Sequence, residues 1–223
     1  MKDESSVIKT MKSTTEIADW RQASSRQERS RLIRDALFKA AADVVGQRGY
    51  QGASVALITQ RANVAQGTFY NHFESRQDIL DQLLPALGKE MLAYIGDHTR
   101  QGKTLQEREV LGFEAFFTFL ANNPNFFRIL NEAESFAPDA HHEHLDLVSG
   151  GYMRMLRRAH ANGELPAYEE GELEVLALIL MAARSYLAWR YVYGEEKHTE
   201  IPEWVTRTYK KFVRYGFSGT PEK

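Results

Sequence analysis

Several side chains in the stretch from Gly52 to Phe73 have the chemistry needed to read a nucleic acid. The amide of Gln66 can form two hydrogen bonds with adenine, and Thr68 can meet a base edge or a thymine methyl group. Gly67 lies between them and has no side chain, so it would let the backbone come close to a ligand. These neighbouring residue types predict contacts with base edges in the major groove of DNA.

A second group in the same stretch suits phosphate oxygens, which fix the register of a protein on DNA without specifying sequence. Tyr70 and His72 have polar tips, and Ser54 can present a hydroxyl and nearby amides at the start of a helix. With Asn71, the candidate DNA-binding residues are Ser54, Gln66, Gly67, Thr68, Tyr70, Asn71 and His72.

Two short helices joined by a tight turn must position these side chains. Ser54 can cap a helix that runs through Arg61, and a second helix is expected from about Gln66 to Asn71. Asn63 falls in the turn, where it tolerates left-handed backbone better than most residues after glycine. Such a helix-turn-helix unit can place its second helix in the major groove. The apolar residues expected to hold it together are Ile58, Val64, Phe69 and Phe73.

A longer helix precedes this unit. Ser25 and Glu28 form a capping-box pattern, and apolar residues then recur at helical spacing until Gly49. Four arginines lie on the polar side of its opening turns, and two interpretations of them remain open. They form a solvated helix face, or one or two of them contact phosphate. These residues are Arg26, Arg29, Arg31 and Arg34.

The rest of the chain keeps the helical pattern, so we predict an all-α fold with about nine helices. No stretch has the pattern of a strand, a low-complexity segment or an internal repeat. Pro85 falls inside the fourth helix, where it should produce a kink that lets the helix swing. We expect a flexible tail over residues 1–24, a helix-turn-helix domain over 25–74 and a larger helical domain over 75–223.

Composition excludes several classes of protein. The chain has no cysteine, so disulfides, thiol catalysis and cysteine-ligated zinc are excluded. Its net charge is -2, but residues 1–80 carry +3 and residues 81–223 carry -5, so the amino-terminal part is better suited to lie near phosphates. No apolar run opens the chain, and the apolar segment 176–183 is far shorter than the roughly 20 residues of a membrane span. Neither a signal peptide nor a membrane partner is expected.

Aromatic residues after position 112 have two possible roles. Helical spacing favours core packing, but phenylalanines in a helical bundle can also line a cavity for an apolar ligand. Arg184 lies in an otherwise apolar helix and needs a partner, either an acidic ligand or a Glu across a dimer interface, and we favour the protein partner. The candidate ligand-binding residues are Phe113, Phe116, Phe117, Phe127, Tyr152 and Arg184.

The run His141-His142-Glu143-His144 suggests a metal site. Four consecutive residues do not all converge on one ion, so we interpret the run as a solvated segment and expect no metal and no cofactor. The sequence shows no set of nucleophile, base and orienting residue and no glycine loop that would cradle phosphate. We therefore expect no enzymatic activity and no catalytic residue.

Taken together, residues 26–84 resemble the DNA-binding domain of the TetR family of bacterial transcriptional regulators. The resemblance is carried by Ile58, Ala62, Val64, Gly67, Thr68, Phe69, Tyr70 and Phe73. It implies a homodimer whose first three helices bind DNA and whose carboxy-terminal helices form a ligand pocket. It also implies a four-helix dimer interface built from the last two helices, at about 172–194 and 202–217. In this family a bound ligand usually moves the fourth helix and releases the operator.

Three residues depart from the family pattern. Ala65 stands where Ser or Thr often caps the third helix, which could cost about 1 kcal/mol. Gln66 replaces a common basic residue, so a phosphate contact is exchanged for base reading, and Asn63 replaces the usual glycine of the turn.

The sequence therefore predicts a ligand-responsive transcriptional regulator in the bacterial cytoplasm, associated with the nucleoid. We expect a repressor that binds a palindromic operator as a dimer and is released by a small apolar or amphipathic molecule. A helical enzyme and a protein-interaction module that does not bind DNA are the alternatives.

Overall fold

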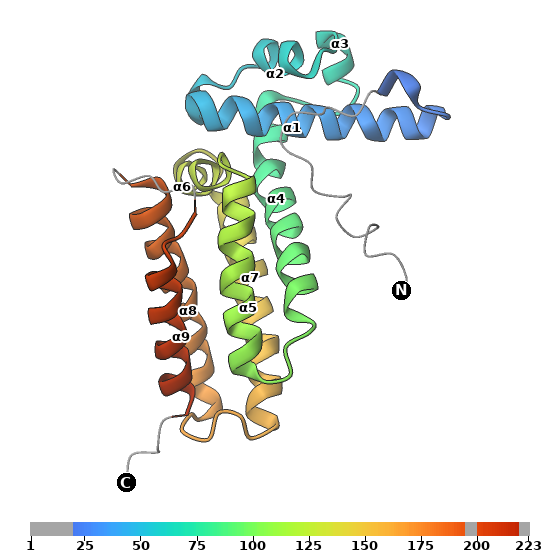
Figure 1. Ribbon diagram of the computed structural model, residues 1–223. Helices are drawn as coiled ribbons and strands as arrows, with labels where there is room; N and C mark the ends of the chain where they lie inside the picture. The colour runs from blue at the N-terminus through green and yellow to red at the C-terminus, as the bar shows by residue number, and fades with distance from the viewer. Residues whose placement is uncertain (1–19, 195–199, 219–223) are drawn as a thin grey trace, which may run out of the picture. The chain divides into compact units, whose positions relative to one another are not determined.

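The computed structural model describes residues 20–194 and 200–218. These residues form nine α-helices and no strand, which confirms the predicted fold class (Figure 1). Most of the predicted amino-terminal tail lies outside the described residues. The helices are α1 (Arg26–Gly52), α2 (Val55–Ala62), α3 (Gln66–Phe69), α4 (Arg76–Thr99), α5 (Leu105–Asn122), α6 (Phe126–Phe136), α7 (Pro138–Ala161), α8 (Leu173–Ala188) and α9 (Glu203–Phe217), with short 3-10 turns η3 (Trp20–Gln22) and η4 (Glu170–Glu172) and a π-helical turn η5 (Trp189–Tyr193).

The chain divides into two compact units. The first contains the residues up to Leu83 together with Asn122–Pro138, and the second contains Leu84–Ala121 together with the residues from Asp139 onward. The division falls inside α4, between Leu83 and Leu84 and one residue before Pro85, and α6 belongs to the first unit. The boundary between these compact units differs from the predicted domain boundary between residues 74 and 75. That boundary concerns where DNA binding ends and ligand binding and dimerisation begin, and it stays a prediction.

In the first unit, α1 provides the helix against which the others pack. Ser25 caps it by accepting the N–H of Glu28 at 3.1 Å. The Glu28 carboxylate accepts the N–H of Ser24 at 2.7 Å, and the backbone of Ser25 also forms a hydrogen bond with it, in line with the predicted capping box. The regular helix is broken at Gly49, whose φ of 75° lies in the left-handed region. The apolar residues predicted from spacing are buried: Ile33, Ala36, Leu37, Ala40, Ala41, Val44 and Val45.

Polar contacts attach α6 to the carboxy-terminal half of α1. The Glu132 carboxylate accepts the N–H of Tyr50 at 2.8 Å and the Nε–H of Arg128 at 2.6 Å. Asn125 donates to Asp43 at 3.2 Å, and Asp43 also pairs with Arg61 of α2 at 3.0 Å. Asp43 is largely buried, so its charge needs these partners. These contacts attach both α2 and α6 to α1.

In the second unit, α5, α7, α8 and α9 lie side by side (Figure 1). Thr104 and Glu107 cap α5 reciprocally, as predicted: Glu107 N–H donates to the Thr104 hydroxyl at 3.2 Å, and Thr104 N–H donates to the Glu107 carboxylate at 3.4 Å. Phe113 of α5 stacks on Tyr209 of α9 with ring centroids 3.9 Å apart. The core of this unit is therefore rich in aromatic contacts between sequentially distant helices.

Part of the apolar surface of α8 and α9 is uncovered in the single chain. The exposed residues are Val175, Leu178, Ile179, Tyr186 and Trp189 near α8, and Trp204, Phe212 and Tyr215 on α9. Within the described residues, the segment Glu170–Tyr193 is long enough and apolar enough to cross a membrane, judged by its length and composition alone. One such segment is weak evidence for a span, because the apolar helix of a soluble protein passes the same test.

Candidate functional site

The turn between α2 and α3 has the geometry that the sequence predicts. Ser54 caps α2 by accepting the N–H of Leu57 at 3.3 Å. Asn63 ends the helix in the left-handed conformation, with φ 54° and ψ 45°, and donates its N–H to the carbonyl of Gln60 at 3.2 Å. Among the described residues no other non-glycine residue has a positive φ, which confirms the special role predicted for Asn63.

Helix α3 is shorter than predicted. It spans Gln66–Phe69 and continues as a turn, in which the N–H of His72 donates to the carbonyl of Phe69 at 2.9 Å. Ala65 occupies the N-cap position with extended backbone and provides no side-chain hydrogen bond, as expected for alanine. The candidate contact residues therefore lie on one helical turn and the turn that follows it.

A buried apolar layer supports this short element. Ile58, Phe69 and Phe73 are buried, and Phe73 meets Phe38 of α1 edge to face with ring centroids 5.2 Å apart. All seven candidate DNA-binding residues are exposed or half-buried. Tyr70 has 59% of its surface exposed, which is unusual for so large an aromatic residue. A Cβ added at Gly67 would meet no atom within 4 Å, so the fold itself leaves open space at that position.

Arg34 fixes the turn that follows α3. Its guanidinium donates to the carbonyl oxygen of His72 at 3.2 Å and to the side-chain oxygen of Gln82 at 2.5 Å. It also lies over the ring of Phe73, 4.7 Å from the centroid. Partial burial, and secondarily the charge of Arg34, lower the pKa of His72 below its ordinary value. His72 is therefore biased toward the neutral form, in which it can donate or accept a hydrogen bond.

Arg76 secures the other side of the unit. Its guanidinium donates to the carbonyl oxygens of Ala53 and Tyr50, which connect α1 to α2. The start of α4 is thereby joined to the segment that leads into the helix-turn-helix unit. Arg34 and Arg76 are positioning residues that the sequence did not single out for this role, because their partners are backbone carbonyls distant in sequence.

The same region matches a known family. Residues 37–83 match the family model described as "Bacterial regulatory proteins, tetR family". This stretch therefore has the amino-terminal region typical of the TetR family of bacterial regulatory proteins. The match covers α2, α3 and the parts of α1 and α4 that support them, so it coincides with the candidate contact surface.

Similar proteins include regulators of lipid metabolism. The fatty acid metabolism regulator protein of Bacillus subtilis is 27% identical over 100 residues, which are 45% of this chain and 50% of that protein. The chain thus spans about half the length of this curated relative. A TetR-family regulator from Rhodococcus sp. superimposes with a TM-score of 0.71 at 21% identity, covering 83% of this chain and 98% of its own. FadR of Bacillus subtilis, solved in complex with stearoyl-CoA, gives a TM-score of 0.69 at 19% identity, covering 83% and 98%.

These two structural similarities establish a common fold. The described residues of the second compact unit contain a buried polar cluster.

The cluster centres on Glu109 of α5. The Glu109 carboxylate accepts from Arg184 of α8 at 2.6 Å and from the hydroxyl of Tyr209 of α9 at 2.6 Å. The hydroxyl of Tyr152 of α7 lies 3.5 Å from the same oxygen. Glu109 and Arg184 are both buried, so each charge depends on the other. Gly112 leaves the space for this approach, since a Cβ there would lie 3.2 Å from Nη2 of Arg184.

The environment changes the proton affinities of the cluster. Burial raises the pKa of Tyr152 and of Tyr209, so both remain protonated donors. Burial opposes the charge of Arg184, but the adjacent Glu109 carboxylate outweighs this effect and raises the pKa of the guanidinium. The Nε–H of Arg184 is buried without a hydrogen-bond partner. The favoured protein partner of Arg184 is thus found, but on α5 of the same chain instead of across a dimer interface.

The candidate ligand-binding residues fall into both units. Phe113, Phe116 and Phe117 are all buried on α5. The ring centroids of Phe113 and Phe117 lie 4.8 Å apart. The guanidinium of Arg184 lies over the ring of Tyr152, 5.2 Å from its centroid. Phe127 lies on α6 in the other unit, so its predicted place beside the other five residues stays a prediction.

The histidine run lies in the first two turns of α7. His141, His142 and Glu143 are exposed or half-buried, and Glu143 pairs with Lys89 at 3.4 Å. His144 is buried against Gly88 of α4, so the prediction of a solvated segment is wrong at this residue. No group of three or more acidic or histidine side chains in the described ranges could hold a metal ion.

Periodicity could have identified the two cluster residues that the sequence analysis missed. Glu109 precedes Gly112 and Phe113 by three and four positions, so it lies on the same buried face of α5. Tyr209 lies midway between Val205 and Val213 at four-residue steps on the buried face of α9. A charged residue and a phenol in register with an apolar stripe indicate a buried polar contact.

Proposed function

We propose that this chain is a ligand-responsive transcriptional regulator that binds DNA through α2 and α3. The observation that carries the proposal is the exposed set of polar residues on α3 and its following turn, held over a buried layer by Arg34 and Arg76. Gln66 and Thr68 would read base edges, and Gly67 would let the backbone approach. Ser54, Tyr70, Asn71 and His72 would contact phosphate.

The regulator would act as a homodimer. The exposed apolar residues of α8 and α9 form a surface that water disfavours, and large aromatic residues are enriched at protein interfaces. This supports an interface over residues 172–194 and 202–217, in which two copies contribute two helices each. A two-fold dimer would present two α3 helices to a palindromic operator. We propose a repressor acting in the bacterial cytoplasm, whose bound dimer obstructs transcription.

The effector would be an amphipathic molecule with a long acyl chain. One relative is a fatty acid metabolism regulator, and one solved structure of the same fold holds stearoyl-CoA. The phenylalanines of α5 suit an acyl chain, and the buried cluster around Arg184 supplies polar groups at the same helix.

Helix α4 offers a route from effector to DNA. Ile95 and Thr99 of α4 lie beside Gly112 in the second unit, close to Arg184. The same helix begins at Arg76, which is bonded to the helix-turn-helix unit. Pro85 removes one backbone hydrogen bond between these two ends, so the helix can bend there. Filling the second unit would then move α4 and weaken DNA binding.

A selection experiment tests DNA binding. Random duplexes of about 30 base pairs, long enough for two half-sites, are selected with the wild-type chain, and affinities are measured by fluorescence anisotropy. Gly67→Ala should leave the free energy of unfolding unchanged or slightly raised, because its Cβ projects into open space. It should weaken binding to the selected duplex roughly tenfold if the backbone approaches DNA there.

Gly96→Ala is the matched control, because a Cβ at Gly96 of α4 also meets nothing within 4 Å. It should leave DNA affinity unchanged. Enrichment of no sequence by the wild-type chain would show that the proposed function is wrong. Stearoyl-CoA, with coenzyme A as its control, then tests release of the selected duplex, and Pro85→Ala tests whether release depends on the hinge.

A further inference from the structure

The side chain of Arg184 lies where several helices of the second compact unit meet. Its guanidinium bonds to the Glu109 carboxylate of α5 and lies 5.2 Å from the ring centroid of Tyr152 of α7. The hydroxyl of Tyr209 reaches the same carboxylate from α9 at 2.6 Å. Figure 1 shows α5, α7, α8 and α9 side by side. A group bound at Arg184 would therefore be next to residues of all four helices.

One donor of Arg184 is not used by the fold. Its Nη2 donates to the carboxylate and to the backbone carbonyl of Glu109, at 2.6 and 3.4 Å. Its Nε–H has no hydrogen-bond partner among the described residues, although only 8% of the surface of Arg184 is exposed. Buried polar groups are almost always paired, because an unpaired group keeps the full cost of losing its contact with water. Arg184 thus lacks one acceptor, which a bound molecule can supply.

The charge of the cluster decides which acceptor fits. Burial raises the pKa of Tyr152 and of Tyr209, so both stay neutral, and the opposite charges of Glu109 and Arg184 balance each other. A second carboxylate at Nε would place a net negative charge in a buried site beside Glu109. A neutral carbonyl oxygen accepts the same hydrogen bond and adds no charge. The cluster therefore favours a neutral acceptor over a carboxylate.

An apolar face continues from this cluster along α5. Four buried residues recur there at three- and four-residue steps and so share one side of the helix: Glu109, Gly112, Phe113 and Phe116. The ring of Phe113 stacks on Tyr209 and lies 4.8 Å from the ring centroid of Phe117. An apolar chain that ends in a carbonyl group matches this order of apolar and polar groups.

We propose that the Nε–H of Arg184 binds the neutral carbonyl at the head of an acyl chain, so that the effector is an acyl ester, thioester or amide and not a free fatty acid. The inference rests on the proposed function and adds to it the residue that selects the effector. Arg184 supplies the donor, and Glu109 disfavours a carboxylate because its own negative charge already balances the guanidinium. The pair thus sets specificity in addition to joining α5 to α8.

The first experiment compares ligands that differ only in the head group. Dodecanamide and dodecanoate have the same acyl chain, but only dodecanoate is charged at about pH 7.5. Their binding to the full chain is measured by isothermal titration calorimetry, at concentrations below those at which they aggregate. We expect the wild-type chain to bind the amide on the order of tenfold more tightly than the carboxylate. Stearoyl-CoA, a thioester, should bind as well.

Two variants separate the roles of the pair. Arg184→Lys keeps a positive charge beside Glu109 but has no Nε–H, so dodecanamide should bind on the order of tenfold more weakly. Glu109→Gln removes the negative charge and leaves Arg184 cationic, so dodecanoate should become the preferred ligand. Arg154→Lys changes an exposed arginine of α7 in the same way as the first variant. This matched control should bind both ligands as the wild type does.

The wild-type chain also gives a readout that does not depend on how well a variant folds. The Nε–H of Arg184 has its own signal in a proton–nitrogen NMR spectrum, assigned through the bonds of the side chain. Dodecanamide should shift this signal, because a new acceptor bonds to the proton. The same concentration of dodecanoate should leave it in place. A purely structural role of Arg184 would give no such difference.

Four results would overturn the inference. They are equal binding of the two ligands by the wild type, unchanged amide binding in Arg184→Lys, an Nε–H signal that dodecanamide does not shift, and a preference for the amide in Glu109→Gln that is folded by circular dichroism. All four leave the proposed function intact if stearoyl-CoA still releases the selected duplex from the wild-type chain. If the wild type binds none of the three ligands, the proposed effector is wrong and the inference fails with it.

Discussion

The guanidinium of Arg34 donates a hydrogen bond to the backbone carbonyl of His72 at 3.2 Å, across 38 residues of sequence. The sequence left open whether this arginine lies on a solvated face or contacts phosphate, and in the structure it holds the turn that carries the candidate phosphate contacts. The planar fork of arginine reaches Gln82 at the same time, which a single ammonium group could not do with the same geometry.

Replacing Arg34 should therefore change His72. In Arg34→Gln the positive charge is removed, so the pKa of His72 should rise toward its ordinary value, though not fully, because partial burial is the larger cause of the lowering. The free energy of unfolding should fall by about 1–3 kcal/mol through the lost charge-assisted hydrogen bonds. NMR titration of the His72 ring and chemical denaturation measure the two effects.

The control is Arg48→Gln, which removes an exposed arginine at the other end of α1. It should alter neither the pKa of His72 nor the stability by a comparable amount. An unchanged His72 titration in Arg34→Gln would contradict the proposed electrostatic contact.

A cap at the start of α3 should stabilise the first unit. Ala65 already has the extended backbone of an N-cap residue, so the hydroxyl in Ala65→Ser can accept an orphan N–H of α3. We expect the free energy of unfolding to increase by about 1 kcal/mol. Ala93→Ser, at an exposed position inside α4, is the control and should be neutral or slightly destabilising. Equal effects of the two serines in a denaturant titration would refute capping.

The buried pair of Glu109 and Arg184 should show strong coupling. Glu109→Leu alone leaves the Arg184 charge buried without its carboxylate and should lower the free energy of unfolding by about 3–5 kcal/mol. Adding Arg184→Met should recover most of this loss, since replacing both charges by apolar groups is often nearly neutral. The double-mutant cycle is measured by urea denaturation. Simple additivity of the two single losses would show that the pair is not coupled.

His144 should make the protein sensitive to acid. Burial lowers its pKa to about 4, with a smaller contribution from His141, whereas the unfolded chain titrates near the ordinary value of 6.5. Below the unfolded pKa only the unfolded state gains the proton, so stability is lost as the pH falls from about 6.5 to about 4 and is unaffected above that range. At about pH 5 the linkage amounts to roughly 2 kcal/mol.

The comparison that isolates this effect is with His144→Gln, which cannot titrate. The free energy of unfolding of both proteins is measured at about pH 7.5 and at about pH 5. Between these two values, the wild type should lose roughly 2 kcal/mol more stability than the variant. His141, whose charge contributes to the lowered pKa of His144, is present in both proteins, so its own titration largely cancels in the difference. A difference that does not vary with pH would show that His144 is not responsible.

The sequence by itself determined the local structure. Cap residues such as Ser54, the left-handed Asn63 and the apolar spacing of α1 act over a few residues, so their signals can be read directly from neighbouring positions. The candidate contact residues on α3 were identified in the same way, and the structure leaves all of them exposed or half-buried.

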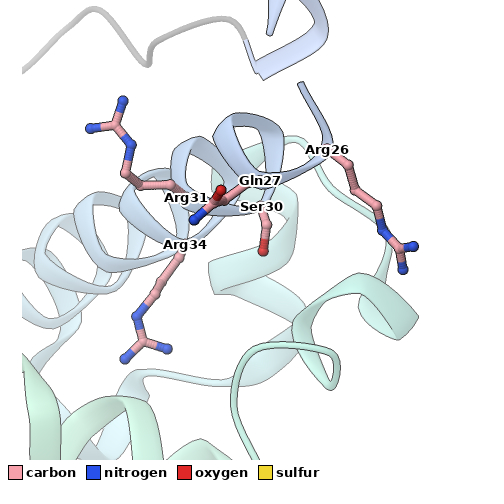
Figure 2. A pocket seen from close by; sticks show the side chains of 5 residues that line it. All are labelled: Arg26, Gln27, Ser30, Arg31 and Arg34. Atoms are coloured by element: carbon pink, nitrogen blue, oxygen red, sulfur yellow. The ribbon is translucent and has the colours of Figure 1, made fainter. Parts of the chain in front are cut away.

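Only the tertiary structure decided which side chains meet. Arg184 donates a hydrogen bond to Glu109, 75 residues away in sequence, and Arg34 donates one to His72, 38 residues away. Arg26 and Arg31 line the same hollow on the opening turns of α1 (Figure 2), whereas Arg29 does not line it. Helical periodicity gives each residue a face, but the partner of that face depends on how helices pack, which is set by the whole core. The physical reason is that hydrogen bonds and ion pairs form only at distances of about 3 Å, and spacing along the chain does not fix such distances between separate helices.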